Sequence, residues 1–319
     1  MQSSIDFSLR VIIIYISKRI AGRSERLRFV TVIIIIVPKF QTPFVIMKAV
    51  RFLLLVVLAF SASAALADEH NAFPGYKGQW NGFDNYEFTV DTEFGARPCR
   101  VVCPKEPAEG NPWVFRAVFF GHEPQTEIAM LKLGWHVAWI GCTDLVGSPE
   151  NVSQRNSFYK YLVDKGLSKK PVLLGMSRGG ITSMNWAIAN PDCVTAIYID
   201  NPVLDFRSWP GAFKPGKRSN PDWESVLKSY HLTEEEAKEY KYCPVDAFGP
   251  LAQRKVPILL VCGDSDSVVP FDINGKVLYE RYKAADAPVE LILKPGNDHH
   301  PHSLKDPKPI VDFYLKAWK

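Results

Sequence analysis

The 319-residue sequence lacks compositional extremes: it has no Cys-x-x-Cys pair, no internal repeat and no low-complexity tract. Only six cysteines are present, and charged residues make up 23% of the chain. These values exclude a disordered chain, a collagen-like chain and a small domain held together by disulfides. The hydrophobic fraction of 47% is instead typical of a globular protein with a sizeable core.

Excess positive charge is missing from most of the chain. The formal net charge is +4, but residues 1–46 carry +5 and residues 47–67 carry +2, which leaves −3 for the remaining 252 residues. Proteins that bind nucleic acids or membrane surfaces do so through basic patches, so this distribution removes the electrostatic basis for such partners. We therefore expect no nucleic-acid partner.

Residues 47–67 have the three parts of a secretory signal peptide. Lys48 and Arg51 precede an apolar segment, residues 52–60, and the segment closes on the small-residue cleavage pattern Ala-Leu-Ala. The apolar part is too short for a membrane-spanning helix. The sequence thus predicts a secreted or periplasmic protein whose mature part, residues 68–319, has no stable membrane span.

Residues 1–46 fit poorly ahead of a signal peptide, which normally stands at the N-terminus. Their apolar runs, Val11–Ile16 and Phe29–Val37, are too short to span a bilayer. One interpretation is a non-native extension of the gene model, with Met47 as the true start. The other is a genuine extension that anchors the protein. We favour the first.

All six cysteines lie in residues 68–319. Cys99 and Cys103 fall in one predicted strand, about 13 Å apart, which excludes a disulfide between them. Cys142 and Cys262 stand in apolar runs and are expected to be buried as small hydrophobic residues. Neither the disulfide pairing nor the oligomeric state follows from the sequence.

From residue 68 onward, short apolar strands alternate with segments of helical periodicity. Strands separated by helices form a parallel sheet covered on both faces, so we predict a three-layer α/β fold with a mostly parallel sheet. Its first two strands are joined by a glycine-containing turn, which predicts an antiparallel start. The predicted strands are Tyr86–Asp91, Cys99–Cys103, Val114–Phe120, His136–Gly141, Pro171–Gly175, Thr195–Ile199, Pro257–Cys262 and Val289–Leu293, and the predicted helices are Val152–Leu162, Gly179–Asn190, Lys276–Ala284 and Pro309–Trp318.

Residues 205–251 interrupt this alternation, and we interpret them as a small cap insertion over a site. They contain Trp209, Trp223, a basic loop and an acidic helix that begins at Thr233. Thr233 and Glu236 have the spacing of a capping box.

A serine stands between a predicted strand and a predicted helix. The segment Gly-Met-Ser-Arg-Gly-Gly, residues 175–180, matches the pattern G-x-S-x-G in the strand–turn–helix context that gives the pattern its meaning. Such a turn needs small flanking residues and lifts the serine hydroxyl above the sheet edge. It also directs the next backbone N–H, that of Arg178, toward a developing oxyanion. Ser177 is therefore the candidate nucleophile.

An acid and a histidine follow in the order that a serine nucleophile of this fold requires. One predicted strand leads into Gly-Asp-Ser-Asp-Ser-Val-Val-Pro at residues 263–270. The next leads into Lys-Pro-Gly-Asn-Asp-His-His-Pro-His at residues 294–302. Both segments follow the carboxyl ends of strands, which is the edge where open α/β sheets bind ligands.

With these three motifs, residues 86–319 resemble the α/β-hydrolase superfamily. The superfamily pattern G-x-x-D-x-x-V-P implies that Asp266 is the triad acid, while Asp264 is expected to support the turn. The base usually follows a glycine-containing turn directly, which favours His299 over its rivals His300 and His302.

The resemblance also implies a second oxyanion donor in the loop after the third strand, where the backbone N–H of His122 or Glu123 is the candidate. Arg178, directly after the serine, resembles the elbow of glucuronoyl esterases, which act on a sugar-acid ester. We interpret its side chain either as a binding group for a substrate carboxylate or as half of a structural ion pair. Trp209 is a candidate to stack on a sugar ring or cover the pocket, but core packing is the interpretation that we favour for it.

These features predict an exported serine hydrolase that cleaves carboxylic esters, of small molecules or of carbohydrates, through an acyl-enzyme. No cofactor is expected. No metal is expected either, because a single tight turn such as the run at residues 299–302 does not readily present the four ligands of a zinc site. The alternatives are a catalytically inactive binding protein of the same fold and a peptidase, although no large specificity domain is visible ahead of the catalytic part.

Overall fold

The computed structural model describes residues 9–19, 28–38 and 73–319, and it separates into an N-terminal and a C-terminal unit. In the first unit, β1 (Leu9–Arg19) and β2 (Arg28–Pro38) pair antiparallel along their whole length. The predicted signal peptide, residues 47–67, lies outside the described residues. Within the described ranges, no helix has the length and hydrophobicity needed to cross a membrane.

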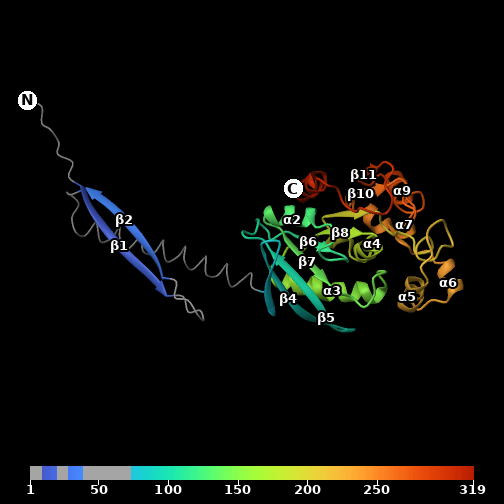
Figure 1. The fold of residues 1–319 in the computed structure, drawn as a ribbon, viewed down its shortest axis with the longest axis horizontal. Coiled ribbons are helices and arrows are strands. Elements are labelled where there is room, and N and C mark those ends of the chain that lie inside the picture. Colours follow the sequence, from blue (N-terminus) through green and yellow to red (C-terminus); the bar gives the residue numbers. More distant parts are fainter. Residues whose placement is uncertain (1–8, 20–27, 39–72) are drawn as a thin grey trace, which may run out of the picture. The chain divides into compact units, whose positions relative to one another are not determined.

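The second unit is built on a nine-stranded sheet with the order β11-β10-β9-β8-β6-β7-β5-β4-β3 (Figure 1). Strands β3, β4, β5 and β7 pair antiparallel, and the pairs from β7 through β6 and β8 to β11 are parallel. The mostly parallel sheet and its antiparallel start are therefore confirmed. The strands are β3 (Tyr76–Trp80), β4 (Phe83–Thr92), β5 (Gly95–Cys103), β6 (Trp113–Arg116), β7 (His136–Ile140), β8 (Val172–Met176), β9 (Ala196–Asp200), β10 (Ile258–Gly263) and β11 (Val289–Lys294).

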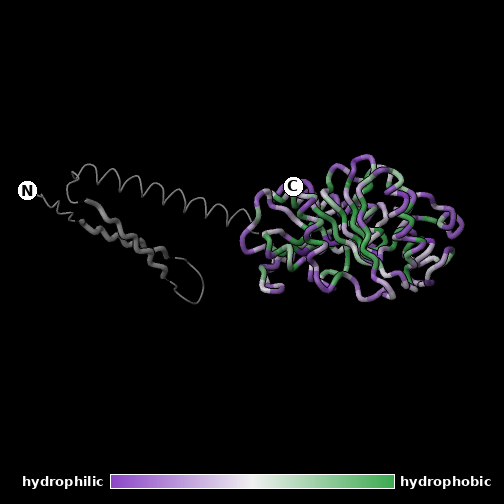
Figure 2. The backbone as a smooth tube through the Cα atoms, turned by 90° about the horizontal axis from the view of Figure 1, so that it is seen from above, coloured by the Kyte–Doolittle hydropathy of each residue, from purple (hydrophilic) through white to green (hydrophobic). Residues whose placement is uncertain are grey.

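Helices cover both faces of this sheet. Side chains alternate across it because successive residues of a strand point to opposite faces: Leu173 of β8 joins one core, while Val172 and Leu174 join the other. Helices α3 (Pro149–Asp164), α4 (Gly179–Ala189) and α9 (Gly275–Ala284) contribute to the first core, and α2 (Gln125–Lys132) and α10 (Lys308–Trp318) to the second. Figure 2 shows the hydrophobic segments in the interior and hydrophilic ones on the outside. The predicted three layers are confirmed.

The segment between β9 and β10 carries four short helices: α5 (Asn220–Tyr230), α6 (Glu234–Lys238), α7 (Pro244–Ala247) and α8 (Gly249–Gln253). The predicted capping box at the start of α6 is present, because Thr233 and Glu236 bond to each other's backbone N–H. Trp223 is buried, with its ring 5.1 Å from that of Phe213 and 6.2 Å from that of Phe206. Trp223 therefore belongs to the packing of the insertion.

The third predicted strand is shorter than the apolar run Val114–Phe120 suggests, because β6 ends at Arg116. The Arg116 guanidinium is fully buried and donates to the carbonyl oxygens of Phe119 and His122, both at 3.0 Å. It also forms a 2.7 Å ion pair with Glu127 of α2. These bonds hold the chain in a loop after Arg116, so the expected strand end at Phe120 was wrong.

The six cysteines are all free thiols in this unit. Cys99 and Cys103 both lie in β5, as predicted. Cys262 is buried and Cys142 is partly buried, and burial raises the pKa of both thiols. They are accordingly packing residues with little thiolate character.

Candidate active site

Ser177 occupies a sharp turn between β8 and α4. Its φ of 53° is in the left-handed region, which few non-glycine residues adopt. A Cβ at Gly175 would lie 2.2 Å from the carbonyl oxygen of Gly179, and one at Gly180 would lie 2.4 Å from Cβ of Pro202. The small residues around the serine are thus sterically required, and the predicted strand–turn–helix context is confirmed.

The three predicted motifs meet at this turn. The Ser177 hydroxyl lies 2.9 Å from Nε2 of His299, and Nδ1 of His299 lies 2.7 Å from Oδ2 of Asp266. Both partners are almost fully buried. The other carboxylate oxygen of Asp266 accepts the backbone N–H groups of Val268 and Val269, at 2.9 and 2.8 Å. The carboxylate is therefore fixed and holds the imidazole with Nε2 toward the serine.

Neither rival histidine is hydrogen-bonded to Ser177 in the part of the chain that the structure describes. His302 is buried, and its Nδ1 lies 2.8 Å from Oδ1 of the buried Asp200. His300 is exposed, and neither ring hydrogen-bonds to Ser177. Asp264 accepts the backbone N–H of Gly296 at 2.7 Å, the supporting position expected for it.

Two residues that the sequence did not single out hold His299 in place. The carboxylate of Asp298 accepts the N–H groups of Ser267 and His299, both at 2.7 Å, and so joins the loop after β10 to the loop after β11. These backbone bonds lower the pKa of Asp298. Asn201 donates to the carbonyl oxygen of His299 at 2.7 Å and accepts the N–H of Gly263 at 2.7 Å. A short polar residue directly after a buried strand is the signal that would have identified Asn201.

A cavity of about 420 Å³ opens beside the serine. Nη1 of Arg178 forms a 2.8 Å ion pair with Asp222 of α5, and its guanidinium carbon lies 4.9 Å from the ring centroid of Trp209. The arginine therefore makes the structural ion pair that was one of its two interpretations, and it does so at the edge of the cavity. The lining residues are Phe119, His122, Ser177, Arg178, Trp209, Val268, His299, His300 and His302.

The loop after β6 brings His122 to the cavity but uses its N–H internally. That N–H donates to the carbonyl oxygen of Phe119 at 3.0 Å, and Glu123 is not among the lining residues. Phe119 lines the cavity with a left-handed φ of 54°. Among the described residues, the backbone N–H groups of Phe119 and Arg178 donate to no protein acceptor. Partial desolvation, and then the charge of His302, lowers the pKa of the His122 imidazole.

A serine in a strained turn, hydrogen-bonded to a buried histidine–aspartate pair at the carboxyl edge of a mostly parallel sheet, defines a serine hydrolase of the α/β-hydrolase fold. The model of the prolyl oligopeptidase family matches residues 150–319, which include all three motifs. The chain belongs to this family.

Relatives of known sequence are similar to part of the chain. The acylamino-acid-releasing enzyme of Rattus norvegicus is 30% identical over 162 residues, which cover 47% of this chain and 20% of that enzyme. The corresponding enzyme of Sus scrofa is 27% identical over 201 residues, covering 59% and 24%. The chain thus spans about a fifth to a quarter of the length of these relatives.

Solved structures share the fold. The acylaminoacyl peptidase of Pyrococcus horikoshii matches with a TM-score of 0.57 at 16% identity, over 74% of this chain and 42% of that one. Est1E from Butyrivibrio proteoclasticus matches with a TM-score of 0.53 at 17% identity, over 73% of this chain and 98% of that one. At such identities the likeness concerns the fold alone.

Proposed function

We propose that this serine hydrolase cleaves carboxylic esters through an acyl-enzyme formed on Ser177. In this mechanism Ser177 Oγ attacks the ester carbonyl carbon while Nε2 of His299 takes the hydroxyl proton. Asp266 stabilises the imidazolium that forms and keeps the ring oriented. The observation that carries the proposal is the continuous hydrogen-bond chain from Ser177 through His299 to Asp266.

We assign the oxyanion donors to the backbone N–H groups of Arg178 and Phe119. Both residues line the cavity beside Ser177, and both N–H groups lack a protein acceptor among the described residues. The N–H of His122 is the weaker candidate, because it already donates to Phe119. When the tetrahedral intermediate collapses, His299 returns the proton to the leaving alkoxide. A water molecule, deprotonated by His299, then releases the acid and regenerates Ser177.

The substrates that we propose are esters of small molecules or carbohydrates. A cavity of about 420 Å³ is of the size that receives a small acyl group. Trp209 borders it, but its side chain is buried in the core and packs against the Arg178 guanidinium, which favours core packing over stacking on a sugar. Because Arg178 already pairs with Asp222, a substrate carboxylate would have to compete with that aspartate for the guanidinium.

A peptidase is the second candidate, and the comparisons favour it. The chain belongs to a family named for an oligopeptidase, and its curated relatives are named as enzymes that release acylated amino acids. The same serine, histidine and oxyanion donors serve amide cleavage, in which the proton goes to a leaving amine.

Side-by-side kinetics distinguish the two candidates. We expect short p-nitrophenyl and acetylated-sugar esters to be hydrolysed and N-acetylated aminoacyl p-nitroanilides and peptides to be left intact, because only turnover of amides separates a serine peptidase, which also cleaves activated esters, from an esterase. Turnover of the N-acetylated amides would establish a peptidase. If Ser177→Ala hydrolyses both as fast as the parent protein, the hydrolysis does not proceed through Ser177 and the proposed mechanism fails. If the parent protein hydrolyses neither substrate, the chain is a binding protein that retains the fold.

The histidine variants identify the base. His299→Ala should reduce kcat by about 10³-fold or more, as loss of a triad member does. His300→Ala and His302→Ala should cost far less, because neither ring bonds to the serine.

We also propose export, based on the signal-peptide pattern of residues 47–67. Intact mass and N-terminal peptide analysis of the native protein should then show a chain that begins at Asp68. A chain that retains residues 1–46 would contradict this proposal.

A further inference from the structure

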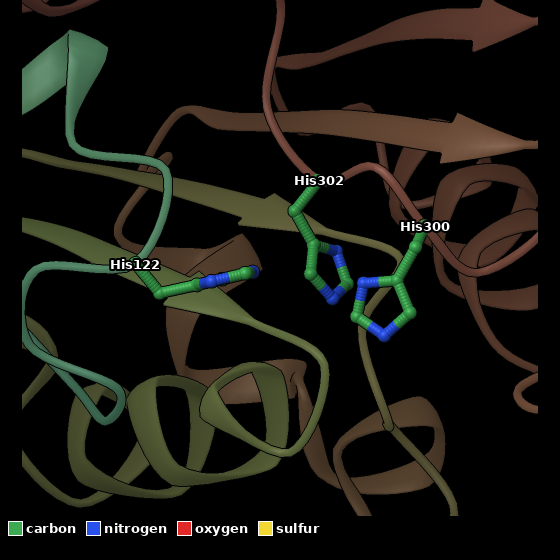
Figure 3. A group of neighbouring side chains, drawn as sticks. All are labelled: His122, His300 and His302. Carbon is green, nitrogen blue, oxygen red and sulfur yellow. The ribbon is translucent and has the colours of Figure 1, made fainter.

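Three imidazoles other than that of His299 face the cavity, and two separate loops supply them. His122 comes from the loop after β6, and His300 and His302 come from the loop after β11. One nitrogen from each ring lies within 4.8 Å of the other two. Figure 3 shows His300 and His302 side by side, with the His122 ring approaching from the opposite loop. The ring centroids of His300 and His302 are 4.6 Å apart.

A buried carboxylate fixes the orientation of one of these rings. Asp200, which is fully buried, accepts a hydrogen bond from Nδ1 of His302 at 2.8 Å and one from the N–H of Ser303 at 3.0 Å. With the carboxylate as acceptor, Nδ1 of His302 is the donor, which leaves Nε2 as the nitrogen for an ion. Metal-binding histidines are usually held in this way, by a carboxylate on the ring nitrogen that does not face the ion.

The other two rings are accessible and adjustable. His122 and His300 are exposed and lie on loops, so small side-chain rotations change the distance between their nitrogens. Three ligands of a tetrahedral zinc ion lie about 3.3 Å from one another when each Zn–N bond is about 2.0–2.1 Å. The present separations, within 4.8 Å, are close to that arrangement, and only the two exposed side chains have to move.

We propose that His122, His300 and His302 bind one divalent transition-metal ion, zinc in particular, and that the bound ion inhibits the hydrolase. Imidazole is a ligand that Zn²⁺ prefers, and a water molecule would complete the tetrahedron. The run at residues 299–302 alone does not supply this site. His122, from a loop far earlier in the chain, provides the third ligand.

The inhibitory role rests on the proposed function. The ring centroid of His299 is 4.9 Å from that of His302 and 5.0 Å from that of His300. An ion held by His300 and His302 would therefore lie directly beside the proposed base, at the mouth of the space that the substrate has to enter. The ion and its water would also occupy part of the cavity on which Ser177 opens.

Zinc binding can be measured without any hydrolysis. Tag-free protein is dialysed against a chelator and then titrated with Zn²⁺ by calorimetry, with Ser177→Ala as a second, inactive sample. We expect one ion per chain in both samples. His122→Ala and His300→Ala, which replace exposed rings, should each weaken binding by about 10–100-fold or more, the loss typical of altered metal sites. His231→Ala, an exposed histidine outside the cluster, is the matched control and should bind zinc like the parent protein.

The hydrolysis assay tests the second half of the proposal. Saturating zinc should lower kcat/KM of the parent protein at least about tenfold, and chelator should restore it. No binding, or binding that both cluster variants retain, would overturn the site. Binding with an unchanged or increased rate would overturn the inhibition. A protein that binds zinc here but hydrolyses no ester or peptide would overturn the proposed function, and with it the inhibitory role, while the metal site would stand.

Discussion

Ser177 keeps its strained backbone because its neighbours hold it by hydrogen bonds. A non-glycine residue in the left-handed region costs about 1–3 kcal/mol, and such strain persists only where the surroundings over-determine it. Here the N–H of Ser177 donates to the backbone carbonyl oxygen of Asp200 at 2.9 Å. The carbonyl oxygen of Ser177 accepts from the backbone N–H groups of Gly180 and Val203, both at 2.9 Å. The hydroxyl is thus presented to His299 before any substrate binds, which is the pre-organisation that acyl transfer needs.

At the same scale, we predict that Asp298→Ala lowers kcat about tenfold with little change in thermal stability. The exposed carboxylate joins the acid loop to the base loop, and without it the His299 backbone loses one of its anchors. Steady-state kinetics and a melting curve measure both effects. Asp298→Asn keeps one acceptor oxygen and should recover part of the rate. Asp272→Ala, an exposed carboxylate on a surface ion pair, is the control. An equal loss of kcat in Asp298→Ala and Asp272→Ala would contradict the role of Asp298 in positioning His299.

Ser177, Asp266 and His299 were predictable from the sequence, because each one lies in the turn or loop that follows a strand. The apolar runs of β8, β10 and β11 fix where the chain leaves the sheet, and Ser177, Asp266 and His299 come within a few residues of those points. Phe119 was not predictable in the same way. An apolar run continues past the end of β6, and only the tertiary pair of Arg116 with Glu127 reveals where the strand stops.

At the scale of the elements, the sequence did not predict strands and helices whose buried face carries few apolar side chains. Strand β3 is an edge strand whose residues are exposed or half-buried. Helix α2 buries Thr126 and Glu127 beside only two apolar residues, so its buried face lacks the apolar periodicity that predicts a helix. Both elements are defined by their neighbours, so single-sequence periodicity does not find them.

The elbow between β8 and α4 gives an element-scale prediction. Gly175→Ala places a methyl group 2.2 Å from a backbone oxygen of α4, so the strand and the helix must separate. We expect a loss of about 1–3 kcal/mol of unfolding free energy, together with a lower kcat because Ser177 moves. Gly249→Ala is the control, because a Cβ there has no neighbour within 4 Å. Denaturant unfolding measures both variants, and equal stability of the two would contradict the steric account.

At the scale of the whole molecule, the buried His136 of β7 predicts how stability depends on pH. Burial lowers its pKa from 6.5 to about 4, so the folded protein keeps this ring neutral. Between those values the unfolded chain binds the proton and the folded chain does not, so stability falls as pH falls below about 6.5. Between pH 7 and pH 5 the titration of His136 alone lowers the unfolding free energy by about 2 kcal/mol.

Replacing the histidine isolates this contribution from that of the carboxylates. His136→Leu cannot titrate, so its unfolding free energy should fall by about 2 kcal/mol less than that of the parent protein between pH 7 and pH 5. Urea unfolding at the two pH values gives the difference. Parallel losses in the two proteins would mean that the folded state protonates His136 as readily as the unfolded chain does.

The histidine cluster also belongs to the scale of the whole molecule. His122 and His302 meet because the loops after β6 and β11 converge on the same cavity, although several strands separate them in the sheet. Nothing in the run at residues 299–302 indicates that a third ligand arrives from elsewhere. Only the folded chain brings together the proposed metal ligands and the proposed nucleophile.

Covalent labelling tests the central claim, that Ser177 is a nucleophile activated by His299, most directly. The folded protein is treated with a fluorophosphonate, and the modified peptide is identified by mass spectrometry. We predict one label per chain, on Ser177, with labelling slowed by orders of magnitude in His299→Ala and far less in His300→Ala. A label on another serine, or equal labelling rates in the parent protein and His299→Ala, would contradict the account.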